Sequence, residues 1–298
     1  MNAAIVPIVP AIRIKRILFP TDFSEASRTA LPMATAIARR YGSELYAANV
    51  RTPLPYTMYS PEAVCAIDNK REREAREEMG KLLHGRELDG VPTSVVVETG
   101  DPAEELERIV RDHDIDLAVL SSHGRKGLMR MLMGSLAEEL FRNLSIPVLT
   151  VGPRLHPRFA HLETVKCILY PTDLSVKSRA ALPYVASLAA EYRARVVVLH
   201  VLPRAHAMEE SVLELTAKVR KEMKHFFSGE IDPRCQVEFL VDFGDAPERI
   251  LHTAEECHVD LMAFGVQRAG EASTHFRNSI AYQLVLQADC PVLTCRAR

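Results

Sequence analysis

The feature that most limits how this chain can fold is an internal repeat. Residues 15–50 read KRILFPTDFSEASRTALPMATAIARRYGSELYAANV, and residues 166–201 read KCILYPTDLSVKSRAALPYVASLAAEYRARVVVLHV. The two segments align without a gap, and 15 of the 36 paired positions are identical. Residues 95–150 align in the same way with residues 239–294. A repeat of roughly 150 residues has the length of a whole domain, so the chain is predicted to contain two copies of one domain.

The domain boundaries follow from the repeat. A chain of 298 residues is long enough for two independent cores. We expect the first domain at residues 1–152 and the second at residues 166–298. The segment between them, residues 153–165, contains two prolines and two histidines and is predicted to be a linker.

Composition and charge exclude several classes of protein. Hydrophobic residues make up 47% of the chain, and no apolar run approaches the 18 or so residues of a membrane span. The leader MNAAIVPIVPAIRIKR carries its basic residues after the apolar stretch, whereas a secretory signal carries them before it. A net charge of −2 gives no electrostatic reason to expect nucleic acid. We therefore expect a cytoplasmic protein that binds neither membrane nor nucleic acid.

The six cysteines show no CxxC pair and no histidine at a matching spacing. This pattern indicates neither a zinc site nor a disulfide scaffold. We expect the cysteines to be small buried hydrophobic residues in a reducing compartment.

Each copy reads as five strands alternating with helices. In the first copy we expect strands at 16–20, 45–50, 94–97, 116–120 and 147–151, and helices from Ser24 to Tyr41, at 69–83, after Gly100-Asp101-Pro102 and at 135–142. In the second copy the corresponding segments are 167–171, 175–192, 195–201, 235–241, 246–258, 260–265, 279–288 and 291–295. Ser24, Asp101 and Asp245 are predicted N-caps. Strands separated by helices predict an α/β fold with a parallel sheet and right-handed crossovers.

Two loops should meet where ligands bind in such sheets, beyond the carboxyl ends of the strands. One is Thr21-Asp22 after the first strand, and the other is residues 121–135 after the fourth. The second loop combines glycines that permit close approach of the backbone with positive charge and a helix start that can hold an anion; these residues are Gly124, Arg125, Lys126, Gly127, Gly134 and Ser135. A carboxylate opposite a phosphate cradle suits the ribose or the base of a nucleotide.

The pairing of Pro-Thr-Asp after the first strand with a spaced glycine motif after the fourth resembles the universal stress protein family in its tandem form. The resemblance covers about residues 15–152 and 166–295. It implies two tandem Rossmann-like domains of the adenine nucleotide alpha hydrolase type, each a five-stranded parallel sheet in the order 3-2-1-4-5. It also implies ATP as the ligand, with Mg²⁺ as an optional companion, and protein partners that the sequence does not identify.

The resemblance assigns the candidate site residues of the first copy. Asp22 and Val50 would lie beside the adenosine, and Leu120 near the adenine. Those around the phosphates would be Gly124, Arg125, Gly134, Ser135 and Leu136. Pro20, Thr21, Ser121 and Gly127 complete the set. Where the family motif begins with a glycine, this copy has Ser121.

The second copy departs further from the motif. It has Gly265 at the first position, but Arg268 and Asn278 stand where the other two glycines are expected. Side chains at these positions would occupy space that a phosphate needs. We therefore expect one ATP per chain, bound in the first copy, while the second copy binds no nucleotide or another ligand.

Interpretations without a ligand stay open. Ser135 with Glu138 forms a capping box, and Asp22 can cap the turn after its strand. His123 is expected to be an exposed loop residue. The chain shows no P-loop, no G-x-S-x-G and no HExxH motif, so no catalytic residue is assigned and at most a weak ATPase is expected.

Three functions are therefore considered. The first is a stress-response regulator that senses ATP, and the second is a scaffold that needs no nucleotide. The third and least favoured is an adenylating or dinucleotide-dependent enzyme. Family members pair through their fifth strands, so the resemblance also implies that residues 147–151 and 291–295 pair within the chain as a pseudo-dimer. Dimerisation of the whole chain is a further expectation.

Overall fold

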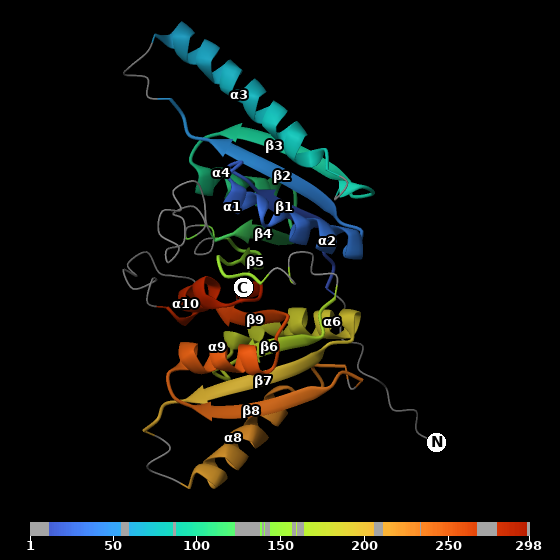
Figure 1. Ribbon diagram of the computed structural model, residues 1–298, viewed down its shortest axis with the longest axis vertical. Coiled ribbons are helices and arrows are strands. Elements are labelled where there is room, and N and C mark those ends of the chain that lie inside the picture. Colours follow the sequence, from blue (N-terminus) through green and yellow to red (C-terminus); the bar gives the residue numbers. More distant parts are fainter. Residues whose placement is uncertain are drawn as a thin grey trace. The chain divides into compact units, whose positions relative to one another are not determined.

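The computed structural model describes residues 12–54, 60–85, 88–122, 138, 140, 144–156, 159, 164–205, 211–232, 234–266 and 279–296. The chain divides into two compact units, residues 13–153 and residues 154–298, with Ile12 joining the second (Figure 1). The main-chain N–H of Ile12 donates to Ser187 Oγ at 3.0 Å. The predicted pairing of the two fifth strands concerns how the units are placed relative to each other and stays a prediction.

The first unit is built on a parallel five-stranded sheet. Its strands are β1 (Arg16–Pro20), β2 (Glu44–Arg51), β3 (Thr93–Thr99), β4 (Leu117–Ser121) and β5 (Val148–Val151). They lie in the order β3-β2-β1-β4-β5. Ile17, Leu18 and Phe19 of the central strand β1 are fully buried, as expected for a strand covered on both faces. The predicted strand order 3-2-1-4-5 is confirmed.

The second unit repeats this sheet. Its strands are β6 (Cys167–Pro171), β7 (Arg195–Leu202), β8 (Val237–Phe243), β9 (Leu261–Val266) and β10 (Val292–Arg296), in the order β8-β7-β6-β9-β10. Ile17 pairs with Leu45 and Leu117, and the equivalent Ile168 pairs with Val196 and Leu261. The register of the central strands is therefore the same in both copies.

Helices flank both sheets. In the first unit they are α1 (Glu25–Arg28), α2 (Leu31–Tyr41), α3 (Pro61–Leu83) and α4 (Pro102–Asp112). In the second they are the 3₁₀ turn η3 (Ser178–Ala181), α6 (Leu182–Tyr192), α8 (Val212–Phe226), α9 (Ala246–Glu256) and α10 (Ile280–Gln287). The sequence pattern implied a helix between β7 and β8 without giving its range, and α8 supplies it. Within the described residues no helix is long and apolar enough to cross a membrane.

Two predicted helices need correction. The single helix expected from Ser24 to Tyr41 is split into α1 and α2, and the one expected over 175–192 is split into η3 and α6. Pro32 and Pro183 stand at the starts of α2 and α6, where a proline lacks the N–H that would continue the preceding turn. Helix α3 also begins earlier than predicted, because Ser60 caps it and Pro61 opens it.

The predicted N-caps are confirmed. Ser24 accepts a hydrogen bond from the N–H of Ser27, Asp101 accepts from those of Ala103 and Glu104, and Asp245 accepts from that of Glu248. Of the helix expected at 135–142, only Glu138 and Leu140 lie among the described residues, and both are helical.

Candidate functional site

Six of the candidate residues lie at the carboxyl ends of three adjacent strands. Pro20 ends β1, and Thr21 and Asp22 follow it. Val50 lies near the end of β2, and Leu120 and Ser121 end β4. Because β1 lies between β2 and β4, these residues share one edge of the sheet. The remaining candidates lie outside the described residues: Gly124, Arg125, Gly127, Gly134, Ser135 and Leu136.

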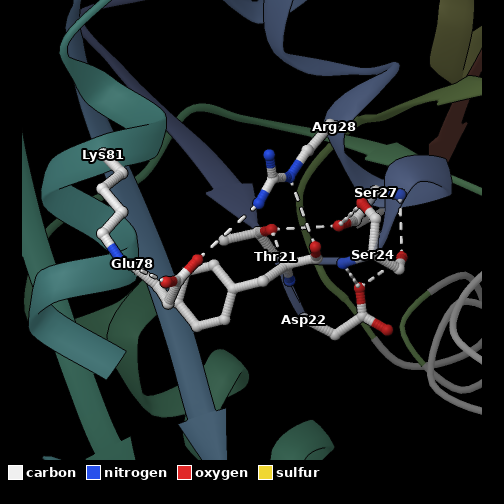
Figure 2. Close-up of polar contacts among 8 residues, drawn as sticks. Thr21, Asp22, Ser24, Ser27, Arg28, Glu78 and Lys81 are labelled. Carbon is white, nitrogen blue, oxygen red and sulfur yellow. Dashed lines mark hydrogen bonds and ion pairs between the residues drawn. The ribbon is translucent and has the colours of Figure 1, made fainter. Parts of the chain in front are cut away.

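Side chains of the loop after β1 hold it in shape (Figure 2). Thr21 Oγ1 lies 3.0 Å from Ser27 Oγ and accepts from the N–H of Phe23, whose φ of 65° turns the chain. Asp22 Oδ1 accepts from the N–H of Ser24 at 3.0 Å and from its hydroxyl at 2.6 Å. Asp22 therefore shapes the turn, the ligand-independent role considered for it, while it lies at the edge where a nucleotide is expected.

A residue that sequence reasoning missed joins this loop to β2. The side-chain amide of the buried Asn49 donates to the main-chain oxygen of Thr21 at 2.8 Å. In the second copy His200 Nδ1 contacts the oxygen of Thr172 at 2.7 Å. The signal was present in the repeat, because both copies have a polar residue at this position with an apolar residue on each side of it.

The equivalent loop of the second copy has the same hydrogen bonds. Thr172 Oγ1 lies 2.9 Å from Ser178 Oγ, and the N–H of Ser175 donates to Asp173 Oδ1 at 2.9 Å. Partial burial raises the pKa of Asp173, but hydrogen bonds from Ser175 and Ser178 and from the backbone outweigh it, so the pKa lies below its ordinary value. The Pro-Thr-Asp loop is thus one structural unit used twice.

The turns that follow these loops differ. The first copy forms the α-helical turn α1, whereas the second forms the 3₁₀ turn η3. The hydroxyl of the fully buried Tyr170 donates to the main-chain oxygen of Ser178 at 2.5 Å, and its burial raises its pKa well above the ordinary value. The equivalent residue in the first copy is Phe19, which has no hydroxyl. The second copy therefore holds its turn against the sheet by a bond that the first copy lacks.

The two copies also differ at the position of Ser121. In the second copy it is Gly265 of β9. A Cβ at Gly265 would collide with the main-chain oxygen of Lys177 and would lie 2.9 Å from both Cα and O of Ser178. These are backbone atoms, which cannot move aside cheaply. Because Ser121 carries a Cβ and a hydroxyl, the first copy has room at this edge that the second copy fills with its own backbone.

A buried arginine stands next to Val50 at the end of β2. Arg51 Nη1 donates to the main-chain oxygen of Asp68 at 2.9 Å and to its carboxylate at 3.1 Å, and Nη2 lies 3.8 Å from Glu72. Its Nε is buried with no partner among the described residues. The second copy has Leu202 here. Arg51 ties α3 to the candidate edge of the first copy only, and sequence reasoning did not single it out.

These observations define a tandem α/β protein whose two copies differ at the carboxyl edge, where the second copy packs backbone atoms against Gly265. The sequence profile of the Universal stress protein family matches residues 13–152 and 164–296, so the chain belongs to this family.

Curated relatives and a solved structure resemble the chain. Universal stress protein MJ0531 of Methanocaldococcus jannaschii is 33% identical over 148 residues, which are 46% of this chain and 81% of that protein. Universal stress protein MJ0577 of the same organism is 28% identical over 156 residues, 47% of this chain and 96% of that protein. A universal stress protein from Archaeoglobus fulgidus has the same fold, with a TM-score of 0.72 and 19% identity over 96% of this chain and 99% of that one.

Proposed function

We propose that the chain is a stress-response regulator that binds one ATP at the carboxyl edge of its first copy and hydrolyses it slowly if at all. The proposal rests on the Thr21-Asp22 loop, on the glycine motif over 121–135 and on membership of the family. ATP would act as a conformational ligand that changes how the protein contacts its partners.

The observation that carries the proposal is the difference between the two copies in the glycine motif after the fourth strand. Both copies keep the loop after the first strand, so this loop alone does not distinguish them. At the end of the fourth strand the second copy places backbone atoms against Gly265, whereas the first copy accommodates the side chain of Ser121. The first copy retains two of the three motif glycines, Gly124 and Gly134. The second copy has Arg268 and Asn278 at these positions, and their side chains would occupy space that a phosphate needs.

The metal that can accompany ATP needs no dedicated protein site. Among the described residues no group of three or more His, Cys, Asp or Glu side chains could hold a metal ion. Mg²⁺ binds nucleotides through phosphate oxygens and retained waters, so it would enter with the triphosphate.

Titration calorimetry of the full chain with ATP tests the proposal. We expect one equivalent per chain, and a stabilisation of about 2.7 kcal/mol at an ATP concentration 100 times the dissociation constant. Asp22→Ala should weaken ATP binding by about 1–3 kcal/mol if the carboxylate makes a charged hydrogen bond to the ligand. Asp173→Ala is the matched control and should leave ATP affinity unaltered. Two equivalents per chain, no binding, or equal losses in the two variants would contradict the proposal.

A further inference from the structure

A pocket of about 770 Å³ opens in the second unit between the turn after β6 and the second half of α8. Two apolar side chains line it, Leu174 and Phe226. The rest of the lining is polar and mostly basic: Arg179, Lys218, Lys221, His225 and Glu222. Three cations against one carboxylate leave the lining with a positive formal charge even when His225 is neutral.

The charge of the pocket comes from one face of α8. Lys218 lies three and four residues before Lys221 and Glu222, which lie four and three residues before His225, and all four are exposed. A neighbouring face of the helix carries the buried residues Leu215, Val219 and Met223. Packing against the sheet therefore fixes the direction in which the basic face points.

Two of these cations have no ion-pair partner in the part of the chain that the structure describes. Lys218 and Lys221 form no ion pair with any described residue. They lie three residues apart on the same helix face, where like charges repel and destabilise the helix. A bound anion would offset this repulsion.

The third cation is held in place by the protein. The guanidinium of Arg179 lies 4.7 Å from the centre of the Phe226 ring, a cation–π distance. Its Nη2 donates to Glu230 Oε1 at 2.8 Å and to the main-chain oxygen of Phe226 at 3.3 Å. Both bonds use Nη2, and arginine has further N–H donors on Nε and Nη1.

The first copy has the opposite charge at the same place. Met79 of α3 and Met223 of α8 are both fully buried, and Ala75 and Val219 are both buried one turn earlier, which aligns the two helices. This alignment pairs Glu74 with Lys218 and Glu77 with Lys221.

On the equivalent face of α3, glutamates form ion pairs with basic residues of the first copy. Glu78 accepts from Lys81 at 2.7 Å and lies 3.9 Å from Arg28 Nη2, as Figure 2 shows. Glu74 lies 3.7 Å from Lys70. Where this face of the first copy has Glu74 and Glu77, the second copy has two lysines with no ion pair to a described residue.

We propose that this pocket is a second ligand site, independent of the ATP site, and that it binds a small phosphate-bearing anion. A phosphate monoester carries a charge of about −1.5 to −2 at pH 7 and three acceptor oxygens. It can therefore accept hydrogen bonds from several cationic donors at once, and it carries more charge than a single carboxylate. Lys218 and Lys221 would supply the ammonium donors and Arg179 the guanidinium. Leu174 and Phe226 would contact an organic group attached to the phosphate.

Calorimetry with the full chain saturated with ATP tests this site, with pyrophosphate and phenyl phosphate as probes. The double variant Lys218→Glu, Lys221→Glu installs the residues of the first copy and should weaken binding of both probes at least tenfold. The matched control Arg220→Glu, Lys224→Glu makes the same change of charge at exposed positions of α8 outside the pocket lining. It should weaken binding less than threefold.

The two probes separate the sources of phosphate. Leu174→Ala should weaken phenyl phosphate binding alone if the natural ligand is an organic phosphate, whereas preference for pyrophosphate indicates an inorganic one. The proposal is overturned if neither probe binds the wild type, or if the two double variants lose affinity equally. A failure of ATP to bind would leave this comparison intact, because both double variants concern α8 alone.

Discussion

The side-chain amide of Asn49 donates a hydrogen bond of 2.8 Å to the main-chain oxygen of Thr21. This bond ties the loop after β1 to β2 and so sets where Asp22 stands relative to Val50. His200 and Thr172 repeat the contact in the second copy, where no nucleotide is expected. Comparing variants at these two contacts therefore separates an effect on stability from an effect on ATP binding.

Asn49→Ala should weaken both folding and ATP binding. The buried oxygen of Thr21 would lose this partner, which costs about 1–3 kcal/mol. Urea unfolding gives the loss of stability, and calorimetry gives the loss of ATP affinity. His200→Ala is the control, expected to lower stability without changing ATP affinity. Unchanged affinity in Asn49→Ala would show that this bond does not position the site.

Gly265→Ser and Ser121→Gly, which exchange the residues at the ends of β9 and β4, should lower the stability by different amounts. Gly265→Ser places a side chain against the backbone of Lys177 and Ser178, and such overpacking typically costs about 1–3 kcal/mol. Ser121→Gly removes a side chain from a partly exposed strand end and should cost less than about 1 kcal/mol. Thermal unfolding of both variants measures the difference. Equal losses of stability would show that Gly265 is not packed more tightly than Ser121.

The carboxylate of Asp173 should make stability depend on pH. Its pKa is lowered in the folded protein, so its contribution is present above the ordinary pKa of about 3.9 and is lost as the pH falls through the lower folded value. Asp173→Asn should therefore be less stable than the wild type at pH 7, and the two should converge at acidic pH. Urea unfolding across this range measures the difference, and a gap that persists below the folded pKa would contradict the assignment.

The cysteines should react with alkylating reagents in the order of their exposure. All six are free thiols, and Cys65 is exposed while Cys167, Cys290 and Cys295 are buried. Burial raises the pKa of Cys167 to about 11 and that of Cys290 to about 12, so both stay protonated and unreactive at pH 8. Mass spectrometry after brief labelling should find Cys65 modified first. Early modification of Cys167 would contradict the packing of β6.

The cysteines also show how much of the burial of a side chain can be predicted from its residue type alone. The expectation of small buried residues is confirmed for Cys167, Cys290 and Cys295 but is wrong for Cys65, which lies exposed on α3. Cys235 and Cys257 are intermediate. Residue type predicts an average burial, whereas the exposure of one thiol depends on which face of its helix meets the sheet.

The sequence by itself determined the tandem repeat, which appears when the chain is aligned with itself. It also determined the alternation of strands and helices and the N-caps at Ser24 and Asp101, because these depend on residues close together in the chain. The order of the strands came from the family resemblance. Only the tertiary structure decided that Gly265 meets the backbone of Lys177 and that the basic face of α8 meets Arg179 in a pocket. These contacts join residues far apart in the sequence, and their distances exist only once the sheet has folded and fixed how each helix and turn packs against it.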